Sequence, residues 1–300
     1  MANSILTESA RVLLAEIVDY AGLFPPAQLL MTEAVANYAA YQKSDYNLML
    51  GRFILPVARL DEFAESAKDF FSRDKKLWKL SVLASEDIYG TVREIEDFNR
   101  DYAAFAVCDA LEVKAKTGAQ IEQINETVPP ELTTYFEIPV DENLGDAVAT
   151  LAICGRRAKI RTGGITPDAF PSARQIARFV RTCVAASVPF KATAGLHHPL
   201  RCTKPLTYEK DAECGAMHGF LNVFLATAFL RQGYKLNFIN QLLEDEQAEN
   251  FQFEDDGFLW RQEHFVSTLQ LKNLREKSII SFGSCSFEEP ITDLREIGIL

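Results

Sequence analysis

Two lysines stand near the ends of two neighbouring predicted strands, with a spacing that suits amine chemistry. Lys159 lies in the segment AKIR and precedes a Thr-Gly-Gly turn, and Lys191 lies in PFKAT and precedes an Ala-Gly turn. One strand–helix unit separates the two lysines, so we expect both side chains to point into one pocket. Two close ammonium groups lower each other's pKa, and a neutral lysine amine can attack a carbonyl carbon to form a Schiff base. The pair therefore predicts a catalytic or substrate-binding site.

Further charged residues lie on the same group of predicted strands. Glu112 and Lys114 are two positions apart, as are Lys159 and Arg161, and residues two apart point to the same face of a strand. Charged side chains inside a barrel are costly unless they form ion pairs or take part in chemistry. We expect Glu112 to move protons, Arg161 to bind an anionic group, and Glu137 to contact the substrate or act as an acid or base. Taken singly, Lys114 and Glu137 also fit rim positions, where strand-end charges are common.

Three of the four histidines cluster after the second lysine. His197 and His198 lie in the loop that follows Lys191, and His218 lies near the start of the next predicted helix. Because a neutral imidazole in a cleft suits proton transfer, we expect His197 and His198 to be the catalytic candidates and His218 to contact the substrate. Plain packing of the loop is the alternative.

The cysteines give a weaker pattern. The spacings of His198 to Cys202 and of Cys214 to His218 resemble a zinc site, but a pair four residues apart also arises by chance on a helix. We therefore predict no tightly bound metal and no cofactor. The six cysteines form no Cys-x-x-Cys pair, which is typical of a reduced, cytoplasmic protein.

Glycines follow both lysine strands. Gly163, Gly164 and Gly195 permit positive φ angles and close approach of the backbone to a ligand. They either cradle an anion or serve only the strand-to-helix turns, which commonly use glycine. We include them among the substrate-binding candidates.

The elements that must position these residues alternate along the chain. Strands are predicted at residues 20–26, 52–57, 78–83, 110–114, 134–138, 158–161, 189–193 and 278–282. Helices are predicted at 4–19, 32–42, 61–71, 87–97, 119–127, 141–153, 172–186, 215–232 and 238–250. Strict alternation requires a parallel sheet, and eight units favour a closed α/β fold, the (βα)₈ TIM barrel, whose site lies at the carboxyl ends of its strands.

Nothing in the sequence marks a second domain. We predict a single domain over residues 1–300, with an N-terminal helix and with residues 233–277 as an insertion before the last strand. Aromatic residues in that insertion are expected to pack on the barrel or against a second copy of the chain, so a homo-oligomer is one expectation. No Gly-x-Gly-x-x-Gly segment follows a strand, so the signature of dinucleotide-binding folds is missing.

The two lysine segments, KIRTGG and KATAGL, resemble the strand-6 and strand-7 signatures of deoxyribose-phosphate aldolases, which are class I aldolases with a barrel fold. The resemblance implies that Lys159 forms the Schiff base, that Lys191 tunes it, and that the strand-4 acid of that family corresponds to Glu112. The phosphate of that family is held by backbone amides after the last two strands, which fall here near Gly195, Gly283 and Ser284.

The chain departs from that family in several places. Arg161 replaces a small residue beside the Schiff-base lysine, and the loop LHHPLR follows the second lysine strand. Glu288 and Glu289, after the last strand, would repel a phosphate. As a whole the chain more closely resembles an uncharacterised bacterial TIM-barrel family that carries the phrase FKATAGLHHPLR. The resemblance implies a shared scaffold and imine chemistry, and it names no substrate.

Composition excludes some classes of partner. Lys plus Arg total 31 and Asp plus Glu total 42, so the net charge is −11. An acidic surface disfavours nucleic acid and anionic membranes. The longest apolar stretch falls short of the roughly 20 residues that a membrane span needs, and the charged N-terminus is unlike a secretory signal.

Three hypotheses follow from these patterns. The first is an aldolase-like or lyase-like enzyme that acts on a small carbonyl metabolite, with or without a phosphate group, through a lysine Schiff base. The second keeps the pocket but has no covalent step, so that the lysines and Arg161 bind an anion while Glu137 and a histidine do acid–base work. The third is a barrel without catalytic activity that binds a metabolite or a protein.

Overall fold

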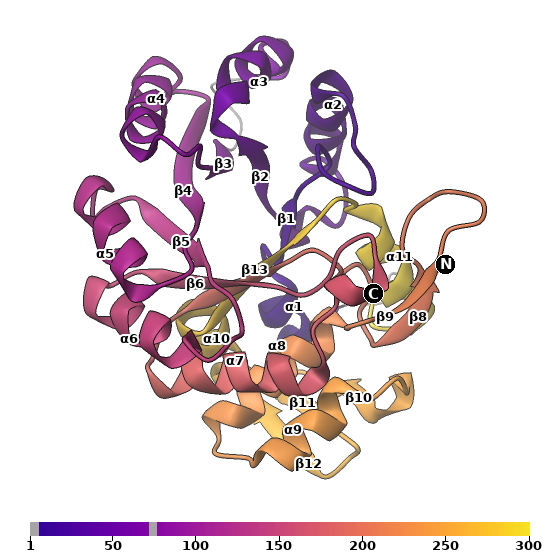
Figure 1. Ribbon diagram of the computed structural model, residues 1–300. Helices are drawn as coiled ribbons and strands as arrows, with labels where there is room; N and C mark the ends of the chain where they lie inside the picture. The colour runs from indigo at the N-terminus through magenta and orange to yellow at the C-terminus, as the bar shows by residue number, and fades with distance from the viewer. Residues whose placement is uncertain (1–5, 72–76) are drawn as a thin grey trace.

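The structure is a computed structural model that describes residues 6–71 and 77–300. Eight parallel strands close into a barrel in the order β1-β2-β3-β4-β5-β6-β7-β13, and helices lie outside it (Figure 1). The predicted (βα)₈ TIM barrel is therefore confirmed. The barrel strands are β1 (Val18–Tyr20), β2 (Leu50–Pro56), β3 (Trp78–Leu83), β4 (Ala106–Lys114), β5 (Thr133–Glu137), β6 (Arg157–Arg161), β7 (Phe190–Thr193) and β13 (Ile279–Ser284).

The helices that precede or alternate with these strands are α1 (Glu8–Leu14), α2 (Met31–Tyr41), α3 (Leu60–Ala67), α4 (Ile88–Asp101), α5 (Gly118–Thr127), α6 (Leu144–Cys154), α7 (Ala173–Ala185), α8 (Phe220–Arg231) and α11 (Glu288–Glu296). Residues 233–277 hold α9 (Leu236–Leu243), a three-stranded sheet and α10 (Thr268–Lys277). That sheet consists of β10 (Phe251–Phe253), β11 (Gly257–Trp260) and β12 (His264–Ser267).

Local signals in the sequence fix where several helices begin and end. The Asp87 carboxylate accepts a hydrogen bond from the Gly90 amide at 2.9 Å and caps α4. Ser172 opens α7 with a reciprocal capping box, and Gly155 ends α6 with a φ of 65°. Such caps satisfy backbone groups that a helix end would otherwise leave without partners.

The hydrophobic core lies between the strands and the surrounding helices. Phe53, Phe190 and Phe282 point outward from their strands and pack against aromatic rings of α3, α7 and α8. Because successive side chains of a strand face opposite sides, the residues beside these phenylalanines face the barrel interior. Many of those inward positions carry charge, which is unusual for barrels of this class.

Helix α8 explains the longest apolar run of the sequence. Every residue from Phe220 to Leu230 is buried, because α7, α9, α10 and β13 all pack against this helix. In the described part of the chain, no helix is long and apolar enough to cross a membrane.

Four predicted elements differ from the structure, one of them the helix at 238–250, since α9 already ends at Leu243. The first barrel strand is β1, not residues 20–26, because Pro25 and Pro26 cannot donate the hydrogen bonds of a ladder. Residues 214–217 form a strand rather than the start of a long helix, and α8 begins only after Gly219. Of the predicted helix at 4–19, only α1 forms within the described residues, and its expected start at residue 4 lies outside them.

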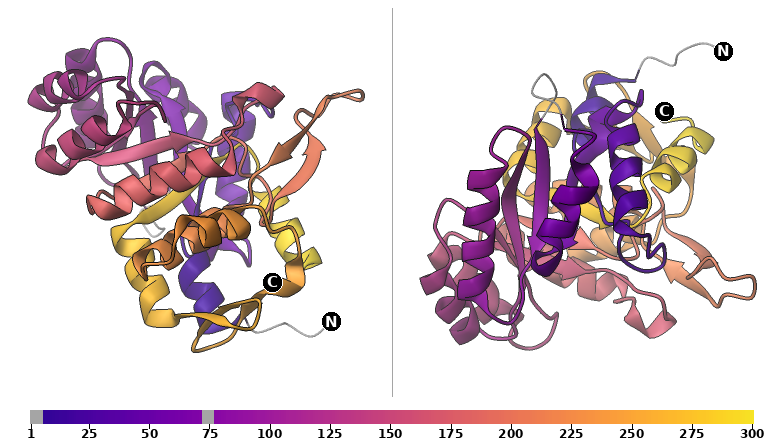
Figure 2. Two further views of the ribbon diagram at one scale, coloured as in Figure 1. Left: turned by 60° about the horizontal axis from the view of Figure 1, so that its bottom comes forward. Right: turned by 90° about the horizontal axis from the view of Figure 1, so that it is seen from above.

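A β-hairpin follows the lysine strand β7. It consists of β8 (Cys202–Pro205) and β9 (Cys214–Met217), which pair antiparallel. Both views of Figure 2 show this hairpin extending away from the barrel. Because it is inserted directly after β7, it lies on the side of the barrel where the predicted site residues gather.

Candidate functional site

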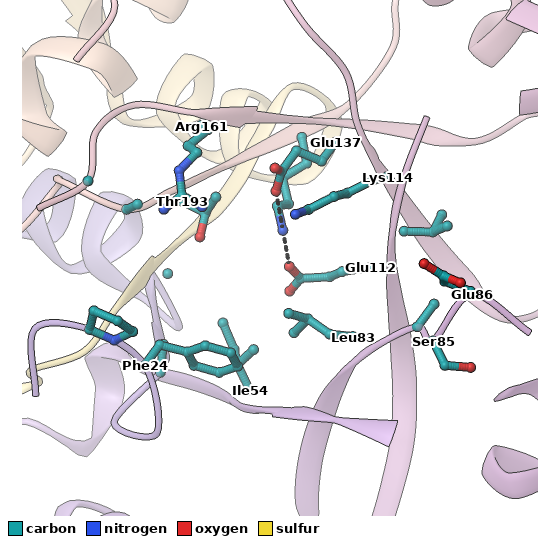
Figure 3. A pocket seen from close by; sticks show the side chains of 18 of the residues that line it. Phe24, Ile54, Leu83, Ser85, Glu86, Glu112, Lys114, Glu137, Arg161 and Thr193 are labelled. Carbon is teal, nitrogen blue, oxygen red and sulfur yellow. Dashed lines mark hydrogen bonds and ion pairs between the residues drawn. The ribbon is translucent and has the colours of Figure 1, made fainter. Parts of the chain in front are cut away.

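A cavity of about 1050 Å³ lies at the carboxyl ends of the barrel strands. Apolar side chains, among them Phe24, Ile54 and Leu83, line one side of it, and charged side chains line the other (Figure 3). This is the end of the barrel at which TIM-barrel enzymes carry their sites. The cavity is large enough for a small metabolite.

Lys159 lies at the floor of this cavity between two carboxylates. Its Nζ is 2.6 Å from Oε2 of Glu112 and 2.9 Å from Oε2 of Glu137. The lysine is only 5 % exposed, yet it lines the cavity. A buried amine is thus in reach of a ligand and has two proton acceptors in contact with it.

Lys191 lies beneath the floor and is fully buried. Its Nζ is 2.8 Å from Oε1 of Glu112, and it donates a second hydrogen bond to Asp19. The ammonium also lies 5.3 Å from the centroid of the Tyr135 ring, a distance at which a cation is attracted by the ring face. Lys191 does not line the cavity, so we infer that it acts on a ligand only through Glu112.

Glu112 connects the two lysines. One of its oxygens accepts from Lys159 and the other from Lys191, and Ser81 Oγ donates to it at 2.7 Å. Burial alone would raise the pKa of Glu112, but the two ammonium groups outweigh burial and hold the pKa far below its usual range. Glu112 therefore stays ionised at neutral pH.

The expected lowering of the lysine pKa values is not found. Burial lowers the pKa of Lys159, but Glu112 and Glu137 outweigh burial and raise it. Burial likewise lowers the pKa of Lys191, and Asp19 and Glu112 outweigh it. From the sequence, Glu112 and Glu137 are expected to offset only part of the repulsion between the lysines, whereas in the structure these two carboxylates and Asp19 contact the ammonium groups directly. Both amines are therefore protonated in the resting protein.

The register of the strands explains why these groups meet. Lys114, Glu137, Lys159 and Lys191 are successive cross-strand partners on β4, β5, β6 and β7. Neighbouring strands lie about 4.8 Å apart, so the four side chains form one row across the interior. Above this row Arg161 pairs in register with Thr193, and both residues line the cavity.

Among the histidines, only His197 lines the cavity. Its Nδ1 is 3.3 Å from the Glu289 carboxylate, 3.3 Å from Ser284 Oγ and 4.0 Å from Cys285 Sγ. Burial lowers the pKa of His197, but hydrogen bonds to Cys285 and Glu289 outweigh burial and raise the pKa to about 9. The imidazole is therefore charged at neutral pH and can donate a proton rather than accept one.

The structure places His198 and His218 outside the cavity lining. His198 is hydrogen-bonded through Nδ1 to Asp293 of α11, and His218 Nε2 is 2.6 Å from the carbonyl oxygen of Pro171. The helical explanation for the Cys214 and His218 spacing is wrong, since Cys214 belongs to strand β9. Within residues 6–71 and 77–300, no group of three or more His, Cys, Asp or Glu side chains is arranged to hold a metal ion.

Of the predicted glycines, Gly164, Gly195 and Gly283 line the cavity. Gly195 has a φ of +73°, and a Cβ there would lie 2.8 Å from the Cα of Gly163. These two glycines therefore let the loops after β6 and β7 pack closely. Ser284 is buried beside His197 and does not line the cavity.

Sequence reasoning missed Asp19 on β1, which holds Lys191 of β7 across the single intervening strand β13. Its carboxylate also accepts hydrogen bonds from Ser281 Oγ at 2.7 Å and from the Arg52 amide at 2.9 Å. A signal existed, because Asp19 interrupts the apolar segment IVDY. Because that segment is predicted to be helical, Asp19 is not recognised from the sequence as an inward-facing strand residue.

Comparison with known proteins adds no relative. No protein-family model matches the chain, and neither does any curated protein. The resemblance to class I aldolases therefore rests on the residues around Lys159 and Lys191, and the structure shares with that family the barrel fold.

Proposed function

We propose that the protein is a lysine-dependent enzyme of the aldolase or lyase type that acts on a small carbonyl compound. The observation that carries this proposal is the position of Lys159, a buried amine at the floor of an open cavity with two carboxylates within 3 Å. A nucleophile within hydrogen-bond reach of a base is the arrangement that covalent catalysis requires.

The first step must remove the proton that the resting Lys159 carries. Glu112 is held by Lys191 and Ser81, whereas among the described residues the Glu137 carboxylate forms an ion pair with Lys159 alone, and it lines the cavity. Glu137 is therefore the acceptor. The neutral amine adds to the carbonyl carbon, and Glu137 returns the proton to the resulting hydroxyl group. Water leaves, and a protonated imine remains on Lys159.

The protonated imine then acts as an electron sink. When a carbon–carbon bond of the substrate breaks, its electron pair moves into the imine and forms an enamine. The hydroxyl group on the leaving fragment becomes a carbonyl group, and its proton passes to a carboxylate. Glu137 is placed for this second transfer as well. His197 stands charged at the cavity wall and donates a hydrogen bond to developing negative charge.

One observation favours a second candidate, an acid–base enzyme without a covalent step. The raised pKa of Lys159 keeps its ammonium form, and an ammonium group can polarise a carbonyl oxygen by hydrogen bonding. Glu137 would then remove a proton from the adjacent carbon. The two candidates use the same residues and differ only in whether a bond forms to Lys159.

Reductive trapping distinguishes the two candidates. The protein is incubated with a panel of small aldehydes, ketones and oxo acids in the presence of sodium borohydride, and its intact mass is measured. A Schiff base gives a stable adduct in the wild type and in Lys116→Met, an exposed lysine outside the cavity, but none in Lys159→Met. Turnover of a panel member without any adduct would support the second candidate and contradict the first.

A further inference from the structure

The charged side chains of the cavity that have no ion-pair partner among the described residues indicate the class of substrate. Inside the barrel, Lys159 and Lys191 are already satisfied by Asp19, Glu112 and Glu137. His197 is likewise paired with Glu289. The barrel network thus sets three carboxylates against two ammonium groups, so it offers no unpaired positive charge to an incoming anion.

Two cations of the cavity lining stand outside this network. Lys114 and Arg161 line the cavity, and neither forms an ion pair or a side-chain hydrogen bond with any residue that the structure describes. Each lies two positions beyond a floor residue on its strand, Lys114 beyond Glu112 and Arg161 beyond Lys159, and so points to the same interior face. Glu137, the cross-strand partner of Lys114, lies between them in Figure 3.

The helix start that follows the last barrel strand is unfavourable for an anion. In many barrels an anion binds near the last strands, at the start of a helix. Here the helix after β13 is α11, and its first turn carries Glu288 and Glu289. Glu288 takes the favourable position at the helix start and repels a second negative charge, while Glu289 is paired with His197. An anionic substrate group is thereby directed toward β4 and β6.

Acidic residues also stand on the rim, next to β3. Glu86 and Asp87 line the cavity from the loop before α4, and Asp87 is engaged in capping that helix. Figure 3 shows Glu86 on the far side of the cavity from Arg161. The free charge of the cavity is thus positive toward β6 and negative toward β3, which orients a polar ligand.

We infer that the substrate is a carbonyl compound with an anionic group, which Arg161 and Lys114 hold above Lys159. Thr193, the cross-strand partner of Arg161, adds a hydroxyl group that has no partner among the described residues. This inference rests on the proposed function only in placing the carbonyl group at Lys159. A carboxylate and a phosphate share the required chemistry, and the test separates them.

Isothermal titration calorimetry with matched probes tests the inference without requiring an imine. Pyruvate is compared with methyl pyruvate, and dihydroxyacetone phosphate with dihydroxyacetone, in the wild type, Arg161→Met, Lys114→Met and the control Lys116→Met. Hydrogen bonds to charged groups contribute enough for about a tenfold or greater preference. We expect the wild type and the control to prefer the charged member of at least one pair by that factor.

The two cavity variants decide which residues are responsible. Arg161→Met should remove most of the preference and Lys114→Met part of it. Equal affinity for charged and uncharged probes, no binding by any probe at millimolar concentration, or an unchanged preference in Arg161→Met would overturn the inference. If a charge preference is found but no adduct ever forms on Lys159, the Schiff-base proposal fails and the anion site stands. If adducts form on Lys159 without a charge preference, the anion-site inference fails and the Schiff-base proposal stands.

Discussion

Replacement of Glu112 by Gln perturbs both lysines at once. The change keeps the shape of the side chain and removes the charge that two buried ammonium groups contact at 2.6 and 2.8 Å. An amide has one acceptor oxygen and one NH₂ group, so its donor must face one of the ammonium groups. Breaking a buried ion pair by removing one partner costs about 3–5 kcal/mol. Because Lys159 keeps Glu137 and Lys191 keeps Asp19, we expect the lower end, about 3 kcal/mol, rather than twice that value.

Urea unfolding followed by circular dichroism measures this loss, with Glu126→Gln, an exposed position on α5, as the matched control. The control should stay within about 0.5 kcal/mol of the wild type. The same variant should move borohydride inactivation to lower pH, because Lys159 loses one of the two carboxylates that raise its pKa. A loss of stability no larger than that of the control, or a pH profile that stays in place, would refute the reasoning.

Three further changes have defined outcomes. Lys191→Met should move borohydride inactivation to higher pH, because Glu112 then interacts with Lys159 alone; an unchanged profile would contradict the coupling. His197 has a folded pKa raised from 6.5 to about 9, so its stabilisation is complete below pH 6.5 and is lost as the pH rises to 9. At about 1.4 kcal/mol per tenfold change in proton affinity this loss amounts to about 3 kcal/mol, and urea unfolding of His197→Gln should lack that slope. Gly195→Ala should lower the melting temperature more than Gly298→Ala, because both have positive φ but only Gly195 has no room for a Cβ; equal losses would show that crowding is irrelevant.

The fold could be predicted from the sequence because its signals are local and repeated. Eight short apolar segments alternate with amphipathic ones, and the closed parallel barrel follows from that alternation. The same period-two pattern placed Glu112, Glu137, Lys159 and Arg161 on inward faces. Those inferences needed only the direction of successive side chains along a strand.

What could not be predicted depends on contacts between distant segments. Asp19 and Lys191 are 172 positions apart, and only barrel closure brings β1 next to β13 and within reach of β7. When Asp19 is left out, the positive charge of the two lysines is underbalanced, and the sequence therefore predicts a lowered lysine pKa. The positions of His198 and His218 could not be predicted for the same reason, since their partners, Asp293 and the Pro171 carbonyl, come from other elements.

The most direct test of the central claim is to locate the reduced adduct by peptide mass spectrometry after borohydride trapping with a carbonyl compound that the protein turns over. The account predicts a single modified residue, Lys159, because it is the amine that lines the cavity between Glu112 and Glu137. An adduct on Lys191 or Lys114 in place of Lys159, or turnover that leaves every lysine unmodified, would contradict it.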